Sequence, residues 1–145
     1  MALYGNRSIP SLLGVLFLLC SGAAIAQSSN QSVRVAIDVK PGDTPTIIQP
    51  KRQGMLPVAI LTTQEFDVAR VDPASVQFGP TGTEAFAFRF ASADVNNDGE
   101  EDLLLLFRMQ DLKLECRDIL LQLRGKTTDG LEIQGEEAVQ MEGCR

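Results

Sequence analysis

The strongest constraint on the fold is an alternation of apolar and polar residues with a period of two, interrupted by short turn sequences. Side chains on a strand point alternately to opposite faces, so this period predicts strands that bury one face. The alternating segments are residues 33–39, 85–91, 112–116, 119–123 and 131–133, and Val139 and Met141 end the pattern. Because turn signals recur roughly every 8 to 12 residues, we expect an all-β fold, a single antiparallel β-sandwich of about seven to nine short strands.

Proline and glycine positions indicate where strands begin and turn. Pro57 stands near the start of the β-branched segment 56–63 and predicts an edge strand or a strand beginning, because proline cannot donate to a neighbouring strand. Asp72 and Pro73 predict a turn between short extended pieces within residues 68–78. Residues 128–130 (Thr-Asp-Gly) predict a hairpin turn.

Two segments carry large apolar side chains. Phe86, Phe88 and Phe90 are spaced by two and should share one face of a strand. Residues 103–107 are apolar at every position and predict a central strand buried on both faces. A helix is the alternative for such a short run, because periodicity alone does not separate the two.

The first 26 residues have the parts of an export signal. Arg7 lies in a short leading region, residues 12–19 are apolar, and Ala24-Ile25-Ala26 is a small-x-small cleavage sequence. We therefore expect a signal peptide over 1–26, a flexible polar leader over 27–32 and one domain over 33–145, with a secreted or periplasmic destination. The alternatives are an uncleaved membrane anchor and a lipid-modified Cys20. After cleavage no membrane span is expected.

The composition of the mature chain excludes several classes of function. It has no His, so a Ser-His-Asp or Cys-His catalytic arrangement and a His-ligated zinc site cannot be built. The whole chain has a net charge of −6, and removing the signal with Arg7 leaves −7, so no nucleic-acid partner is expected. The chain lacks Trp and its only Tyr is Tyr4, which leaves Phe as the one aromatic face for stacking.

Two cysteines, Cys116 and Cys144, remain in the mature chain. An exported protein reaches an oxidising compartment where disulfides persist, so we expect these two to pair. Free thiols and an intermolecular bridge are the alternatives.

One segment has the spacing of a cation-binding loop. Its oxygen-bearing side chains are Asp94, Asn96, Asp98 and Asp102, at loop positions 1, 3, 5 and 9, and Gly99 stands at position 6 where a sharp turn is needed. The backbone carbonyl of Glu100 would supply position 7. These five groups, with a water or a bidentate carboxylate, fit the oxygen shell of Ca²⁺, and Mg²⁺ fits less well because it needs stricter octahedral geometry. The alternative is an acidic solvated turn that binds no metal.

The flanks of this loop differ from those of a helix-loop-helix hand. Position 12, normally a bidentate Glu, is Leu105, and the usually apolar position 8 is Glu101. Both flanking segments have strand-like patterns. The loop is therefore more similar to the strand-loop-strand calcium loop of integrin-type propeller blades, in a single copy.

Several motifs resemble those of a family of exported bacterial β modules. The family reads roughly IDIKPGS, INPKSKGVIPVAIL, VDPSSVxFG, DVDGDGxxDLVLHF and LTGxTxDGxxIxG. Its counterparts here are residues 37–43, 48–61, 71–79, 93–107 and 123–130. The resemblance implies a calcium-loop β domain with no enzymatic activity. Two departures are Asn96, where the family has Asp, and Leu106, where many members have His.

The leading hypothesis is an exported, non-catalytic calcium-binding module with a structural or binding role, expected to be monomeric. A second hypothesis is an adhesin- or inhibitor-like module that binds an unknown protein or envelope partner through a strand edge or the loop at 51–54. A third is a hydrolase with an acid–base carboxylate pair. Its candidate residues are Glu100, Glu101, Asp102, Glu136 and Glu137.

Overall fold

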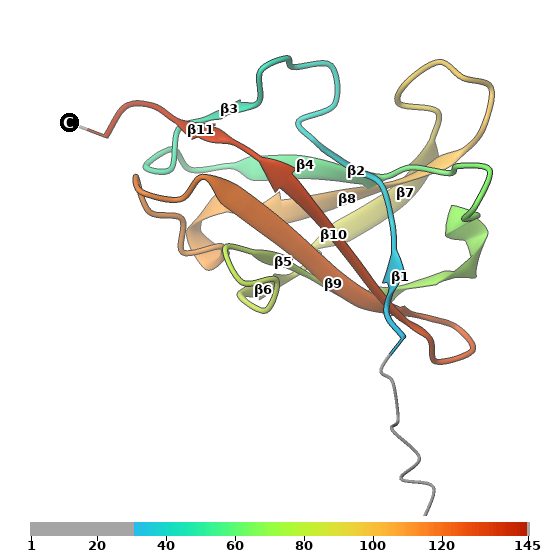
Figure 1. Cartoon of the computed structure of the whole chain (residues 1–145). Coiled ribbons are helices and arrows are strands. Elements are labelled where there is room, and N and C mark those ends of the chain that lie inside the picture. The colour runs from blue at the N-terminus through green and yellow to red at the C-terminus, as the bar shows by residue number, and fades with distance from the viewer. Residues whose placement is uncertain (1–30, 145) are drawn as a thin grey trace, which may run out of the picture.

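The computed structural model describes residues 31–144, in which eleven strands form three sheets (Figure 1). The strands are β1 (Val33–Arg34), β2 (Ile37–Val39), β3 (Ile47–Ile48), β4 (Met55–Ile60), β5 (Val71–Gly79), β6 (Ala85–Phe86), β7 (Arg89–Ala93), β8 (Asp102–Arg108), β9 (Leu120–Thr127), β10 (Glu132–Ala138) and β11 (Gln140–Met141). Short 3-10 helices cover Val68–Arg70 and Met109–Asp111. The expected all-β sandwich is confirmed, although strands of only two residues raise the number of strands above the expected seven to nine.

Two sheets make the two layers of the sandwich. The five-stranded sheet has the order β1-β10-β9-β5-β6, and the four-stranded sheet has the order β2-β4-β8-β7. Phe78 on β5 and Phe107 on β8 meet between them with ring centroids 5.2 Å apart, and both side chains are fully buried. Most pairs of neighbouring strands are antiparallel, but β1 with β10 and β11 with β3 are parallel. The core therefore lies between two sheets whose strands come from the whole length of the domain.

The apolar segment 103–107 forms the central strand β8, paired with β4 on one side and β7 on the other. Leu103, Leu105 and Phe107 point into the core and are buried. Leu104 and Leu106 point outward and are half-buried, so the prediction that both faces of this strand are buried is wrong and only one face is fully covered.

Two segments predicted as single strands are each divided between the two sheets. Residues 33–39 form β1, which pairs with β10, and β2, which pairs with β4. Phe86 belongs to β6 and Phe90 to β7, so the prediction that Phe86, Phe88 and Phe90 share one strand is wrong. All three phenyl rings are exposed. In the sequence, apolar and polar residues alternate without a break where each of these two segments passes from one sheet to the other. The sequence pattern therefore does not reveal the change of sheet.

The two proline predictions have different outcomes. Strand β4 is internal, so Pro57 does not mark an edge strand, but it lies near the beginning of the strand, which was the other expectation. Pairing with β2 begins only at Val58, so Pro57 is tolerated where no β2 residue needs its N–H. The turn predicted at Asp72 and Pro73 is absent. Strand β5 runs on through both residues, and an irregularity in its pairing with β9 between Asp72 and Gln77 accommodates the proline.

The segment 112–116 is a turn and not the predicted strand. Leu112 is buried as an anchor, but Lys113 has φ of 53°, which a strand cannot contain. The predicted hairpin at 128–130 joins β9 to β10, with Gly130 at φ of 91°. The predicted signal peptide over 1–26, Cys20 and most of the leader lie outside the described residues. Among the residues that the structure describes, no helix has the length and apolar character to cross a membrane.

The predicted pairing of Cys116 with Cys144 is confirmed. The two Cα atoms lie 5.8 Å apart and the bond links positions 28 residues apart in the sequence. It ties the C-terminal segment after β11 to the turn that precedes β9.

Replacing both cysteines, as Cys116→Ala with Cys144→Ala, should lower the free energy of unfolding by about 3 kcal/mol, because the unfolded chain is no longer restricted by the crosslink. Urea denaturation of the protein measures this change. Reductant should destabilise the wild type by a similar amount and leave the double variant unchanged. Equal stability of the two proteins without reductant would contradict the prediction.

Candidate metal centre

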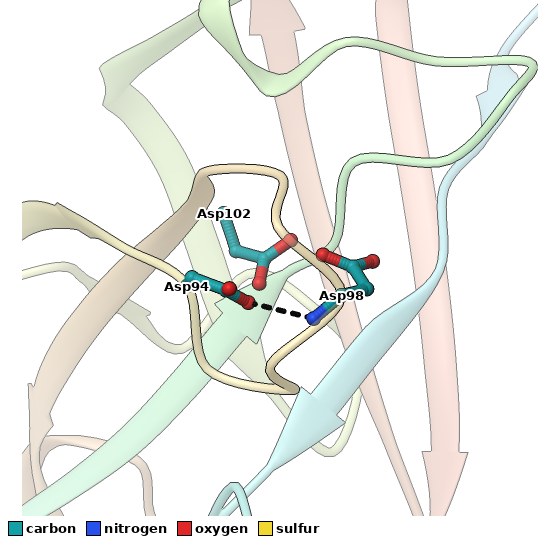
Figure 2. A group of neighbouring side chains, drawn as sticks. All are labelled: Asp94, Asp98 and Asp102. Atoms are coloured by element: carbon teal, nitrogen blue, oxygen red, sulfur yellow. Dashed lines mark hydrogen bonds between the residues drawn. The ribbon is translucent and has the colours of Figure 1, made fainter.

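The acidic loop is the connection of the β7–β8 hairpin, and three of its carboxylates converge. Figure 2 shows Asp94, Asp98 and Asp102 turned toward one another. One carboxylate oxygen from each lies within 4.8 Å of the others. Asp94 and Asp98 are exposed, whereas Asp102 is fully buried. The antiparallel pairing of β7 with β8 places the first and last of these residues side by side, because Ala93 pairs with Asp102.

The loop backbone winds around the Asp94 carboxylate. Asp94 Oδ1 accepts a hydrogen bond from the Asp98 N–H at 3.2 Å, and Oδ2 accepts one from the Gly99 N–H at 3.0 Å. Asp98 Oδ1 in turn accepts from the Glu100 N–H at 2.9 Å. Asn97 and Gly99 have positive φ of 58° and 85°, which makes the tight turn that these bonds need. The residue types at these positions therefore determine the conformation of the loop locally.

Asp102 holds the loop to the body of the domain. Its Oδ1 accepts from the Thr62 N–H at 2.9 Å and its Oδ2 from the Val95 N–H at 3.0 Å. Thr62 follows the end of β4, so the two bonds join separate segments of the chain to one carboxylate. A buried carboxylate needs such partners, because an unpaired one would lose its hydration without compensation.

Thr62 is a residue of the site that sequence reasoning missed. Its hydroxyl donates to the Glu101 carbonyl at 2.7 Å and accepts from the Val68 N–H at 3.3 Å. A surface pocket lies between residues 61–67 and the loop, and Asn96, Asp98 and Glu100 line its other side. A threonine 40 positions from Asp102, in an unpatterned polar stretch, gives no sequence signal of this contact.

The remaining predicted residues lie around this cluster. The Asn96 amide is turned to Asp98, with Nδ2 donating to Asp98 Oδ2 at 3.1 Å and Oδ1 accepting from the Asp98 N–H at 3.3 Å. Glu101 leans toward β7, where its Oε2 accepts from Ser92 Oγ at 2.9 Å. The ligand role of the Glu100 carbonyl stays a prediction.

The cluster has the chemistry of a cation site. Each carboxylate oxygen has two lone pairs, and the N–H bonds to Asp94 and Asp102 use one on each oxygen. The second set of lone pairs is left for a ligand. Three negative charges this close also repel one another, and a bound cation would relieve that repulsion. The arrangement could therefore hold a metal ion.

The second group of acidic candidates, Glu136 and Glu137, lies on β10 in the five-stranded sheet. Neighbouring strand residues point to opposite faces, so the two carboxylates diverge. Glu136 pairs with Arg34 at 3.5 Å on the exposed side. Glu137 Oε2 accepts from the Val39 N–H at 2.7 Å and so links β10 to β2.

Burial raises the pKa of Glu137, and the charge of Asp38 adds to this effect while the Val39 hydrogen bond opposes it. Burial also raises the pKa of Asp38, with repulsion from Asp43 as the second cause. Ionisation of Asp38 and Glu137 therefore costs more free energy in the folded protein than in the unfolded chain.

The comparisons with known proteins add no assignment. No protein-family model matches this chain, and a search of curated proteins returned no match. The resemblance to exported β modules therefore rests on the sequence motifs alone.

Asp102→Ala should lower the free energy of unfolding by about 2 kcal/mol even with a chelator present, because two partly buried N–H groups lose their acceptor. The matched control is Asp98→Ala, an exposed carboxylate of the same cluster, which should stay within about 0.5 kcal/mol of the wild type under the same conditions. Chemical denaturation in chelator measures both. Equal effects of the two substitutions would contradict the anchoring role of Asp102.

Glu137→Gln should stabilise the protein at pH 7, because the amide keeps an acceptor for Val39 and removes a disfavoured charge. The folded-state pKa of Glu137 lies above its ordinary 4.5, so the wild type is penalised above the folded pKa and recovers as pH falls below 4.5. The stability gain of the variant should therefore shrink between pH 7 and pH 4. Thermal unfolding across this range measures it, with Glu136→Gln as the control. A gain that is constant with pH would contradict the assignment.

Proposed function

We propose that this chain is an exported, non-catalytic module in which the 94–102 loop binds Ca²⁺ and the ion stabilises a structural or binding domain. The observation that supports this most directly is the convergence of Asp94, Asp98 and Asp102 within one hairpin. They stand at loop positions 1, 5 and 9, three of the four positions that the sequence spacing assigns to side-chain ligands, and the fourth is Asn96 at position 3.

Calcium is favoured by the donor set. All the candidate ligands are oxygens, the chain contains no His, and Cys116 and Cys144 are joined to each other. The site therefore lacks the ligands that metals preferring imidazole or thiolate need. An exposed loop that offers a mixture of carboxylates, an amide and a carbonyl suits the flexible shell of six to eight oxygens around Ca²⁺.

The ion would act on stability through the hairpin. It would neutralise the three carboxylates and fix the ends of β7 and β8 relative to each other. Because Asp102 also bonds the Thr62 N–H, this restraint extends to the segment after β4. Any ion that binds only the folded state stabilises it by RT ln(1+[Ca²⁺]/Kd).

Export is supported by the disulfide, since such bonds persist in oxidising compartments. Extracellular calcium modules bind with Kd on the order of 10⁻⁴ to 10⁻³ M, and a loop with Leu105 at position 12 lacks the bidentate Glu of tighter sites. We therefore expect a Kd of about 10⁻⁵ to 10⁻³ M.

Addition of Ca²⁺ to the chelator-treated mature domain should raise its Tm, with a gain of about 2.7 kcal/mol when the free ion reaches one hundred times Kd. Calorimetric titration gives the Kd, and Mg²⁺ at equal concentration should give a smaller shift. Asp98→Ala should remove the shift.

The matched control for this experiment is Glu101→Gln, which removes an equal charge from a neighbour that bonds Ser92 and not the cluster. It should retain calcium binding. A wild type without a Tm shift, or an Asp98→Ala variant that keeps the shift, would overturn the proposed function.

A further inference from the structure

Basic side chains gather at one end of the four-stranded sheet, in a chain whose net charge is negative. This basic patch consists of Lys51, Arg52, Met55, Phe88, Arg89 and Arg108, and all six residues are exposed. The ion pairs among the described residues use other arginines and lysines, so the four basic residues of the patch are in none of them. Their positive charge is therefore available to a partner.

Strand pairing brings part of the patch together. Arg89 at the start of β7 pairs with Leu106, and Met55 at the start of β4 pairs with Arg108 at the end of β8. Leu106 points away from the core, and Arg108, two positions further along β8, lies on the same side. Arg89, Met55 and Arg108 therefore project together from the outer face of the sheet.

A turn before β4 adds the other two basic residues. The Arg52 N–H donates to the Gln49 carbonyl at 3.0 Å and closes the turn that carries Lys51. The Met109 N–H donates to the Gly54 carbonyl at 2.9 Å and joins this segment to the end of β8. The turn is thus held beside the arginines of the sheet.

Phe88 lies against two of the arginines. The centroid of its ring is 4.0 Å from Arg108 Cζ and 5.5 Å from Arg89 Cζ. These cation–π contacts hold the guanidinium groups beside the ring and leave their N–H donors free for anionic oxygens. The ring itself is 44% exposed. Charge and apolar surface therefore occur side by side.

A depression next to Met55 increases this apolar surface. It has a volume of about 280 Å³, and its lining includes Ile47, Met55, Pro57 and the basic Arg52. An apolar hollow that also carries a cation suits a molecule with an anionic group on an apolar body. Phospholipids have this chemistry, and basic residues beside exposed apolar side chains are typical of proteins that bind the surface of anionic membranes.

The acidic loop does not oppose such a contact. It joins β7 to β8 at the far end of the hairpin from Arg89 and Arg108, as Figure 1 shows for the β7–β8 connection and the start of β4. Strand β8 has seven residues and so separates the two ends by roughly 20 Å. Charges interact over only about 8 Å at physiological ionic strength, so the loop is screened from a surface that the patch contacts.

We propose that the basic patch binds the surface of an anionic phospholipid bilayer. Its lysine and arginines contact lipid phosphates, and Phe88 and Met55 enter the layer between headgroups and acyl chains. This contact is peripheral and needs no membrane-spanning segment. It is independent of the proposed calcium function, because none of the six residues belongs to the carboxylate cluster.

Sedimentation with sucrose-loaded vesicles tests the proposal. A chain of residues 27–145 keeps every described strand and lacks the apolar segment 12–19, which would itself bind lipid. In chelator, this chain should bind vesicles of about 30% phosphatidylglycerol in phosphatidylcholine at least about tenfold more tightly than pure phosphatidylcholine. Raising the salt from about 0.05 to about 0.5 M should remove most of this binding. Chelator prevents calcium bridges to the acidic loop, so the result does not depend on the calcium function.

Charge reversal should distinguish the patch from the rest of the surface. Arg89→Glu with Arg108→Glu should lower the partition coefficient at least about twentyfold, because two attractive contacts become repulsive. The matched control is Arg124→Glu with Lys126→Glu, which makes the same change in net charge at exposed positions of β9 in the other sheet. It should bind within about threefold of the wild type. Phe88→Ser should lower binding about fivefold at unchanged charge.

Thermal unfolding checks that each variant is folded. Lys51→Glu with Arg52→Glu repeats the charge reversal in a turn outside the sheet and should also weaken binding. A wild type that binds the anionic vesicles no better than pure phosphatidylcholine would overturn the proposal. So would a control pair that loses as much binding as the patch variants, or a Phe88→Ser variant that binds as the wild type does.

Discussion

The buried carboxylate of Asp102 is the interaction on which this end of the sandwich depends. It stands at the first residue of β8, where the central strand leaves the acidic loop, and it accepts N–H groups from Thr62 and Val95. Because a buried carboxylate is stable only with such partners, the loop and the segment after β4 must be placed together. The bond from the Val95 N–H also holds the beginning of the loop next to Asp102, beside Asp94 and Asp98.

The elements of the fold could be predicted from local patterns, but their partners could not. The apolar run that forms β8 and the Thr-Asp-Gly turn between β9 and β10 have strong local signals, and the structure contains both the strand and the turn, although only one face of β8 is fully buried. Residues 33–39 and 85–91 alternate without interruption, yet each crosses from one sheet to the other. Sheet membership depends on which distant strand supplies the hydrogen bonds, and a period of two is the same in either sheet.

The candidate site, too, could be predicted from the sequence only in part. The spacing of Asp94, Asp98 and Asp102 follows from how a short loop presents alternate residues inward, and the three carboxylates do converge. The role of Asp102 as a buried anchor could not be predicted, because its partner Thr62 is distant in sequence and its contact is made through the backbone N–H. Because the donor is a backbone N–H, the type of residue that carries it gives no indication of the contact.

The pairing of β1 with β10 also determines the order in which the two sheets can be completed. Val33 is matched with Ile133, so the first strand of the described domain waits for one of the last. All the strands of the four-stranded sheet lie between Ile37 and Arg108 and can pair before the rest of the chain has folded. The five-stranded sheet closes only when β10 arrives, and the apolar face of the first sheet is uncovered until then. Formation of the four-stranded sheet and completion of the core are thus separate events in folding, and the second follows the first.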